Sequence, residues 1–168
     1  MRAEAHGRGR APMADEIQIG PGSATRLEFR RHFAATPEQL WAALTSPALL
    51  PAWLFARGWP MTECVFEPHK GGLIRQVWTG PEGRTRGLTG RVILAEPPHR
   101  LIHSELYDED WTGGETLVTL QLLPVEGGTE LAMAVDYATP EARDAVAASA
   151  MATEMEEAYR HLDVMLAA

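Results

Sequence analysis

Apolar and polar residues alternate along much of the chain between residues 26 and 137. A period of two places successive side chains on opposite faces, which indicates strands with one buried face. In the segment 129–137, for example, Leu131, Met133 and Val135 share one face. Only short turns separate the strands after residue 61, so strands that are neighbours in sequence should pair antiparallel. The predicted strands are 26–33, 62–68, 73–79, 86–95, 101–106, 115–123 and 129–137.

The last segment of the chain, Pro140–Ala168, has a helical period instead. Its apolar residues recur every three or four positions, which places them on one stripe of a helix. Thr139 is a suitable N-cap, and Pro140 suits the first helical position. Because no Gly or second Pro follows, we expect one uninterrupted helix of about 40 Å, long enough to lie across the whole sheet. The apolar stripe consists of Ala148, Met151, Met155, Ala158, Leu162 and Met165.

Two short helices are predicted between the first and second strands. Thr36-Pro37-Glu38-Gln39 has the pattern of a capping box with proline at the first helical position, and the helix it starts continues through Leu44. Ser46-Pro47 begins a second short helix that ends near Pro51. The apolar face of the first helix would serve the core or a homodimer interface equally well.

This order of elements predicts an α+β fold, in which a curved antiparallel sheet of six to seven strands wraps around the long C-terminal helix. Residues 25–168 should form this single domain, with a cavity between the sheet and the helix. Residues 1–24 are predicted to be a disordered tail and linker, because they contain runs such as Gly20-Pro21-Gly22-Ser23. Met13 is then a candidate for the true start of the chain.

The composition excludes several classes of function. The formal charge of −8 argues against a nucleic-acid partner, which requires a basic surface. No apolar run approaches the ~18 residues of a membrane span, so none is expected. Cys64 is the only cysteine, so an intrachain disulfide and a thiolate metal cage are excluded, which suits a reducing cytoplasm. No motif with the spacing of a metal or cofactor site is present, and we expect neither.

A series of short motifs runs through the chain in a fixed order. They are Arg31-x-Phe33-x-Ala35-x-Pro37-x-x-x-Trp41-x-Ala43-x-Thr45-x-Pro47, Trp53, Gly71-Gly72, Gly90 and Pro97-Pro98-x-Arg100-Leu101. With these motifs the chain resembles the START-like (SRPBCC) superfamily from about Thr25 to the C-terminus. Within that superfamily, it is similar to the bacterial branch named for the activator of the heat-shock-protein-90 ATPase.

The resemblance implies a helix-grip fold and, in the wider superfamily, a cavity for lipids, hormones, polyketides or other apolar ligands. It does not imply one reaction, and the name of the branch implies a chaperone as an alternative partner. Relatives often have a Gly-Trp pair midway along the last helix, where this chain has Met155-Glu156. Many also have a double Trp where Trp53-Leu54 stands here. Both departures bear on the shape of the cavity and therefore on its ligand.

The alanine-rich first half of the last helix indicates where a cavity would lie. Small side chains that face a curved sheet leave volume unfilled, and methionine suits adaptable ligand surfaces. We therefore expect a pocket under Ala148–Met155, with Tyr159 at its floor and Trp53 at its entrance. The alternative is close packing of the helix on the sheet without a void. The predicted ligand contacts are Trp53, Trp78, Trp111, Met133, Tyr137, Ala148, Met151, Met155 and Tyr159.

Three titratable residues within the predicted strands are candidates for chemistry or for buried ion pairs. His103 and Glu105 share one face of their strand and could act as an acid–base pair. The opposite face of that strand is the more apolar one, so we expect both side chains to point outward. Arg31 lies on the apolar face of the first strand, so it should either pair with a carboxylate such as Glu130 or Asp136 or extend its guanidinium to solvent at the sheet edge.

These observations predict a protein that binds a small apolar molecule between sheet and helix, with no catalysis or at most weak catalysis. Two alternatives stay open. An enzyme of the cyclase, dehydratase or hydrolase kind would use His103, Glu105 and Tyr137, which would then face the cavity with shifted pKa values. A co-chaperone-like interaction module would instead show an exposed apolar or charged patch on the outer face of the sheet.

Overall fold

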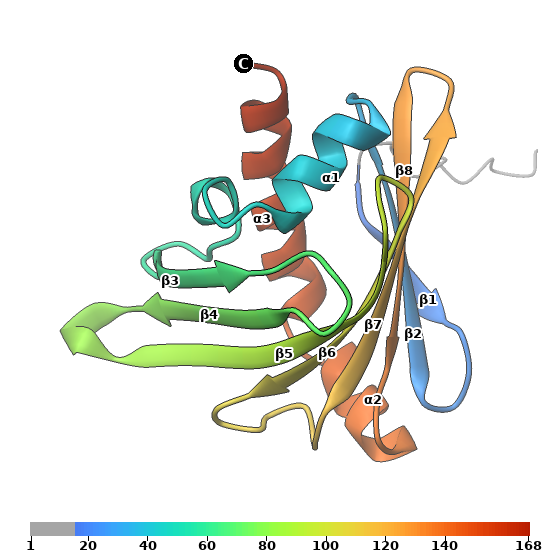
Figure 1. Ribbon diagram of the computed structural model, residues 1–168. Helices are drawn as coiled ribbons and strands as arrows, with labels where there is room; N and C mark the ends of the chain where they lie inside the picture. The colour runs from blue at the N-terminus through green and yellow to red at the C-terminus, as the bar shows by residue number, and fades with distance from the viewer. Residues whose placement is uncertain (1–15) are drawn as a thin grey trace, which may run out of the picture.

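The computed structural model describes residues 16–168, which form one eight-stranded antiparallel sheet that curves around a helix (Figure 1). The strands are β1 (Gln18–Pro21), β2 (Arg26–Phe33), β3 (Met61–Phe66), β4 (Leu73–Thr79), β5 (Thr85–Glu96), β6 (Arg100–Tyr107), β7 (Thr116–Val125) and β8 (Gly128–Asp136). Strands β3 to β8 pair in sequence order, and β2 and then β1 extend the sheet beside β8. The tail before residue 16, with the candidate start at Met13, lies outside the described residues.

All seven strands predicted from the sequence are present, and most of them bury a single face of the sheet. In β2, for example, Leu27 and Phe29 are buried while Glu28 is exposed. The register pairs Leu27 with Val135 of β8 and Phe29 with Met133, so the apolar residues of neighbouring strands meet on the same face. The curved antiparallel α+β sheet is therefore confirmed.

The eighth strand, β1, lies within the segment that the sequence predicts to be linker. Gln18–Pro21 pairs antiparallel with β2, with Ile19 opposite Phe29. The segment is also held from the other side, because the backbone N–H of Ile17 donates to Oε2 of Glu156 at 2.8 Å. This strand depends on a contact between distant parts of the chain, so its short and Gly-Pro-containing sequence does not predict it.

A glycine helps the sheet to curve between β5 and β6. A Cβ atom at Gly90 would lie 2.0 Å from the carbonyl oxygen of Ser104, so the close approach of the two strands requires glycine. The register of this pair then shifts between Val92 and Leu94. Such bulges bend a sheet, and this bend opens the concave side of β4–β6 toward the C-terminal helix (Figure 1).

The first of the two predicted short helices forms, whereas the second is reduced to one helical turn. In α1 (Pro37–Thr45), the N–H of Gln39 donates to Thr36 Oγ1 and the N–H of Thr36 donates to Gln39 Oε1, which completes the capping box. The second is a single 3-10 turn, η1 (Leu50–Ala52). A further turn, η2 (Pro81–Gly83), connects β4 and β5.

The C-terminal helix is not continuous, which corrects the prediction of one uninterrupted rod. It consists of α2 (Pro140–Ala147) and α3 (Met151–Leu166). The hydroxyl of Ser149 donates to the carbonyl of Val146 and accepts from the N–H of Met151, and these bonds compete with the helical ladder between the two helices. At 1.5 Å per residue α3 is about 24 Å long, and no helix of residues 16–168 is long and apolar enough to cross a membrane.

A buried ion-pair cluster fastens α3 to β2. Arg31 is 3% exposed, and its guanidinium lies 2.9 Å from Oε1 of Glu156 and 2.8 Å from Oδ2 of Asp163. Burial alone would lower the pKa of Arg31, but its hydrogen bonds to the two carboxylates outweigh burial and raise the pKa. The predicted partners Glu130 and Asp136 are wrong, because they lie on the outer face of β8 and pair there with arginines of β2.

Candidate ligand-binding site

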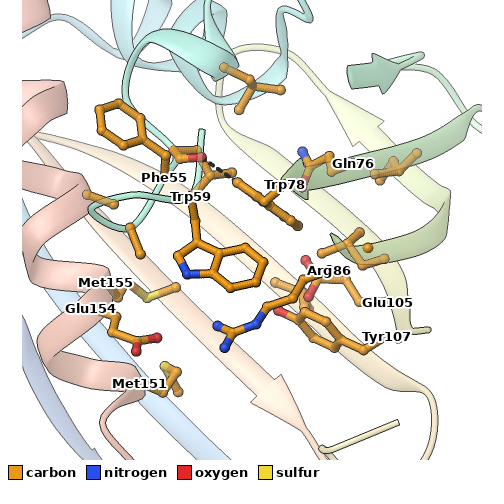
Figure 2. Close-up of a pocket in the computed structure, with 18 of the residues that line it drawn as sticks. Phe55, Trp59, Gln76, Trp78, Arg86, Glu105, Tyr107, Met151, Glu154 and Met155 are labelled. Carbon is orange, nitrogen blue, oxygen red and sulfur yellow. Dashed lines mark hydrogen bonds between the residues drawn. The ribbon is translucent and has the colours of Figure 1, made fainter. Parts of the chain in front are cut away.

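A cavity of about 570 Å³ lies between the concave face of the sheet and α3 (Figure 2). Strands β4 to β8, the segment around η1 and the first half of α3 contribute its walls. Its volume is within the range of about 300–1,000 Å³ that is usual for small-molecule sites. The alternative of close helix-to-sheet packing without a void is therefore excluded.

Most of the residues predicted from the sequence as ligand contacts lie in the wall of this cavity. Those that line it are Trp53, Trp78, Trp111, Met133, Met151, Met155 and Tyr159. Tyr137 and Ala148 do not line it. Tyr137 is buried beyond the end of β8, and Ala148 is the exposed C-cap of α2, because the break in the helix turns it away and brings Ser149 and Ala150 to the cavity instead.

Two tryptophans of the inner wall are held in place by hydrogen bonds. Trp53 donates from Nε1 to the carbonyl of Ala43 at 2.9 Å and stacks on Tyr159 with ring centroids 6.0 Å apart. The sequence analysis placed Trp53 at the entrance of the cavity. Trp53 is only 3% exposed, so it belongs to the inner wall instead. Trp78 donates from Nε1 to the carbonyl of Leu54 at 2.7 Å, which ties β4 to the segment after η1.

Of the residues that form the mouth of the cavity, only Trp111 was singled out from the sequence. Figure 2 shows the indole of Trp59 across the opening, with Arg86 beside it. The guanidinium of Arg86 lies 4.2 Å from the centroid of the Trp59 ring, within the range of a cation–π contact. Glu154 of α3 and the exposed Trp111 also line the mouth. Trp59 lies in an irregular loop, where no hydrophobic period could have identified it.

The inner face of β6 carries polar groups into the cavity, which corrects the predicted outward orientation of His103 and Glu105. His103 is 6% exposed and Glu105 retains 23% of its side-chain surface, and both line the cavity. Nδ1 of His103 lies 3.8 Å from Oε1 of Glu105 and 3.3 Å from the carbonyl oxygen of Ser104. Tyr107 continues the same face toward the mouth, where its ring lies 5.3 Å from that of Trp111.

A second polar group, Gln76 on β4, also lines the cavity. It is 5% exposed, and no residue in the range 16–168 hydrogen-bonds its side-chain amide. It lies between Ile74 and Trp78, which share its inward face, and is paired with Leu88 of β5. The position of Gln76 in a predicted strand was a usable signal, because the alternation that places Trp78 inward also places Gln76 inward.

Burial shifts the titration of the groups around Glu105. Burial raises the pKa of Glu105, although the charge of His103 opposes the shift. Burial and the nearby Glu105 carboxylate raise the pKa of Tyr137 to about 12. The pKa values of Tyr107 and Tyr159 are also raised, mainly by burial. The three phenols therefore stay protonated at neutral pH and can donate hydrogen bonds.

The cavity offers apolar surface together with a few polar groups. Among the described residues, no three His, Cys, Asp or Glu side chains are grouped closely enough to hold a metal ion. His103 and Glu105 could move a proton, but Tyr137, the third residue of the predicted catalytic set, does not line the cavity. The wall otherwise offers aromatic and aliphatic surface with a few hydrogen-bonding groups, which is the usual make-up of a ligand pocket.

The fold and the sequence both relate this chain to known proteins. A crystal structure of a protein from Rhodobacter sphaeroides is 99% identical over 91% of this chain and 99% of that one, with a TM-score of 0.89. A solution structure from Arthrobacter aurescens, at 24% identity, covers 89% of this chain and 91% of that chain with a TM-score of 0.78. The AHSA1 protein from Silicibacter pomeroyi, at 22% identity, covers 84% of this chain and 97% of that chain with a TM-score of 0.68.

The last two structures establish the fold alone, because their identities are below 25%. No curated protein matches the sequence. The family model for "Activator of Hsp90 ATPase homolog 1-like protein" matches residues 34–167, which include α1, β3 to β8 and both C-terminal helices. The chain therefore belongs to the activator of Hsp90 ATPase homolog 1-like family, with the helix-grip fold that its motifs predict.

Proposed function

We propose that this protein binds a small, mainly apolar molecule in the cavity between the sheet and α3. The observation that carries the proposal is the 570 Å³ cavity itself, with walls that are largely aromatic and aliphatic. The hydrogen bonds of Trp53 and Trp78 support it, because rings that are already fixed lose little freedom when a ligand binds. Burial of apolar surface would supply most of the affinity.

The expected affinity follows from the size of the ligand. Drug-sized ligands gain about 0.3 kcal/mol for each non-hydrogen atom. A ligand of about 20 such atoms would gain about 6 kcal/mol, which corresponds to a Kd of some tens of micromolar. Binding assays should therefore cover the range from about 1 μM to about 1 mM.

A substitution on α3 tests whether the cavity is the binding site. Met155→Trp fills part of the cavity and should weaken binding of the uncharged dye N-phenyl-1-naphthylamine by about tenfold or more. The matched control is Val164→Trp on the same helix, because Val164 is 74% exposed and does not line the cavity. Fluorescence titration measures both affinities, and thermal unfolding checks that both variants fold.

Equal dye binding by the two variants would refute the cavity as the site. Native mass spectrometry of the protein purified from its own host provides an independent test. A co-purifying small molecule that Met155→Trp loses and Val164→Trp keeps would identify the natural ligand.

A chaperone-binding module is the second candidate, because the outer face of the sheet exposes apolar side chains. Leu106 of β6, Leu117 of β7 and Leu123 of β7 are 42%, 37% and 39% exposed. They point away from the cavity, since Leu106 alternates with the inward-facing Glu105 and Leu117 is paired with Asp136 on the outer face. Exposed apolar surface of this kind often marks a protein partner.

The test of this second candidate is the ATPase rate of a bacterial Hsp90-type chaperone with and without the purified protein. Stimulation that Leu106→Asp and Leu117→Asp together abolish would support it. An unchanged ATPase rate and no complex at tens of micromolar would dismiss it and would leave the cavity as the functional site.

A further inference from the structure

The amide of Gln76 is a buried polar group without a hydrogen-bond partner in the part of the protein that the structure describes. Its residue is 5% exposed, and no group in the described part of the chain hydrogen-bonds it. Polar side-chain atoms that are both fully inaccessible and unpaired are absent among residues 16–168, so the Gln76 amide keeps accessible surface. Since Gln76 lines the cavity, that surface faces the space where a ligand would lie (Figure 2).

The neighbours of Gln76 make this arrangement unusual for a side chain with only a packing role. Ile74 and Trp78 precede and follow it on the inward face of β4, Leu88 lies opposite on β5, and Cys64, whose thiol is only a weak hydrogen-bond donor, lies opposite on β3. None of these neighbours hydrogen-bonds the amide, so leucine would fill the same wall without leaving a donor and an acceptor unpaired. A buried amide is destabilising unless it is hydrogen-bonded, and a ligand can supply the missing partner.

The charges around the cavity indicate what kind of partner fits. Glu105 lies on the inner face of β6, with His103 and Tyr107 on the same strand and Thr116 opposite on β7. The raised pKa of Glu105 reflects burial that no arginine or lysine of the described residues compensates. Within residues 16–168, the one guanidinium in the wall is that of Arg86, which lies at the mouth against Trp59. A ligand carboxylate in the interior of the cavity would therefore be buried without an arginine or lysine partner among the described residues.

An ammonium group is also a poor fit at the inner end. Burial raises the pKa of Glu105 and His103 lies 3.8 Å from its carboxyl group, so this side chain is a weak counter-ion for an ammonium group. Other acids that line the cavity, Glu109 and Glu154, are exposed at the mouth. An uncharged oxygen, in contrast, needs only one donor or one acceptor, and an amide supplies both.

We propose that the inner end of the cavity selects ligands that carry an uncharged hydroxyl or carbonyl group on an apolar body, and that Gln76 is the residue that recognises this group. The proposal rests on the proposed function and narrows it from apolar molecules in general to alcohols, ketones and related neutral compounds. Gln76 contacts the hydroxyl or carbonyl group of the ligand directly, and the aromatic wall packs against the apolar body of the ligand.

Matched naphthalene compounds test this proposal by displacement of N-phenyl-1-naphthylamine. 1-Naphthol and 1-methylnaphthalene have nearly the same shape and differ in the hydroxyl group. At about pH 6.5, where a phenol is uncharged, the wild-type protein should bind 1-naphthol about tenfold more tightly, which is the effect of one buried hydrogen bond. Gln76→Leu and Gln76→Met should both reduce this ratio to about one while 1-methylnaphthalene binds within about twofold of wild type.

The control is a Gln-to-Leu substitution on the opposite face of the sheet. Gln121 of β7 is exposed and is paired with Arg100 and Ala132 on the outer face, so Gln121→Leu should keep the tenfold ratio. Two variants at Gln76 are used because methionine keeps the length of glutamine, so at least one of them should retain the fold.

Each remaining outcome overturns the proposal in a distinct way. A wild-type ratio near one, or a ratio that survives both Gln76 substitutions, would show that Gln76 does not select the ligand while the cavity still binds apolar molecules. Tighter binding of 1-naphthoate or 1-naphthylmethylammonium than of 1-naphthol would show that the cavity prefers a charged group. Failure of the dye and of 1-methylnaphthalene to bind at all would refute the proposed function itself, and this proposal with it.

Discussion

Arg31 on β2 and Gln76 on β4 are two polar side chains on the concave face of the sheet. They are buried to nearly the same extent, but they differ in whether other residues bond to them. Arg31 is 3% exposed and has two carboxylate partners from α3. Gln76 is 5% exposed and has no partner among residues 16–168. The region around β2 and β8 is filled by packed side chains and the ion-pair cluster, whereas the region around β4 to β6 is left open.

The difference separates a structural role from a binding role. A buried charge that is fully paired within the protein fixes how two elements meet, here β2 and α3. A buried amide that lacks a partner and faces a cavity keeps its hydrogen-bonding capacity for something else. On this view the closed half of the sheet holds α3 in place, and the open half provides the cavity under the same helix.

The largest expected change in the free energy of unfolding comes from disrupting the Arg31 ion pairs in the closed half of the sheet. Arg31→Met removes the guanidinium and leaves the largely buried Glu156 carboxylate without its main partner. Loss of one member of a buried ion pair typically lowers the free energy of unfolding by about 3–5 kcal/mol, and because Asp163 is partly exposed we expect about 3 kcal/mol here. Urea denaturation monitored by circular dichroism measures the change.

The control for Arg31 is another arginine of the same strand. Arg26 pairs with Asp136 at 2.8 Å, and both side chains are partly exposed. Arg26→Met should lower the free energy of unfolding by less than about 1 kcal/mol, as is usual for surface ion pairs. Similar losses for the two variants would mean that the Arg31 cluster does not fasten α3.

The closed half shows how far the sequence predicts the fold. Seven strands follow from alternation, because the alternation is a direct result of burying one face. The capping box at Thr36 and Gln39 was also predicted, because its hydrogen bonds are local. Strand β1 and the carboxylate partners of Arg31 were missed or assigned wrongly, since both depend on contacts with α3 that only the folded chain brings together.

The open half shows why sites are harder to predict than strands. The rule that the more apolar face points inward failed at β6, where His103 and Glu105 face the cavity. A binding cavity is the place where polar groups are kept inside, so local rules are expected to fail there. The break at Ser149 was missed as well, because its hydroxyl competes with the helical ladder and neither Gly nor Pro marks the position.

A smaller change in the free energy of unfolding, an increase instead of a decrease, is expected from substitution of Gln76. Gln76→Leu removes an unpaired amide from an apolar wall, so the ligand-free protein should become more stable by about 1 kcal/mol. Urea denaturation without ligand measures this gain, and Gln121→Leu on the outer face should change the free energy of unfolding by less than about 0.5 kcal/mol. A loss of stability of the size expected for Arg31→Met would place Gln76 among the structural residues instead.

The smallest effect concerns how stability depends on pH in the open half. Because burial raises the pKa of Glu105, the folded protein holds that proton more tightly than the unfolded chain does. The stability that this group contributes is therefore fully present when the pH is below the ordinary glutamate pKa. It is lost as the pH rises from about 4.5 through the raised pKa of Glu105.

Glu105→Gln removes this titration, so the variant should gain stability relative to the wild type as the pH increases from about 5 to about 8. Comparison of urea midpoints at several pH values measures the gain. Glu126→Gln in the exposed turn between β7 and β8 is the control and should follow the wild-type curve. The opposite trend, a wild-type protein that becomes relatively more stable with rising pH, would mean that a positive charge compensates Glu105. The open half would then resemble the closed half around Arg31, and the neutral-ligand proposal would lose its electrostatic support.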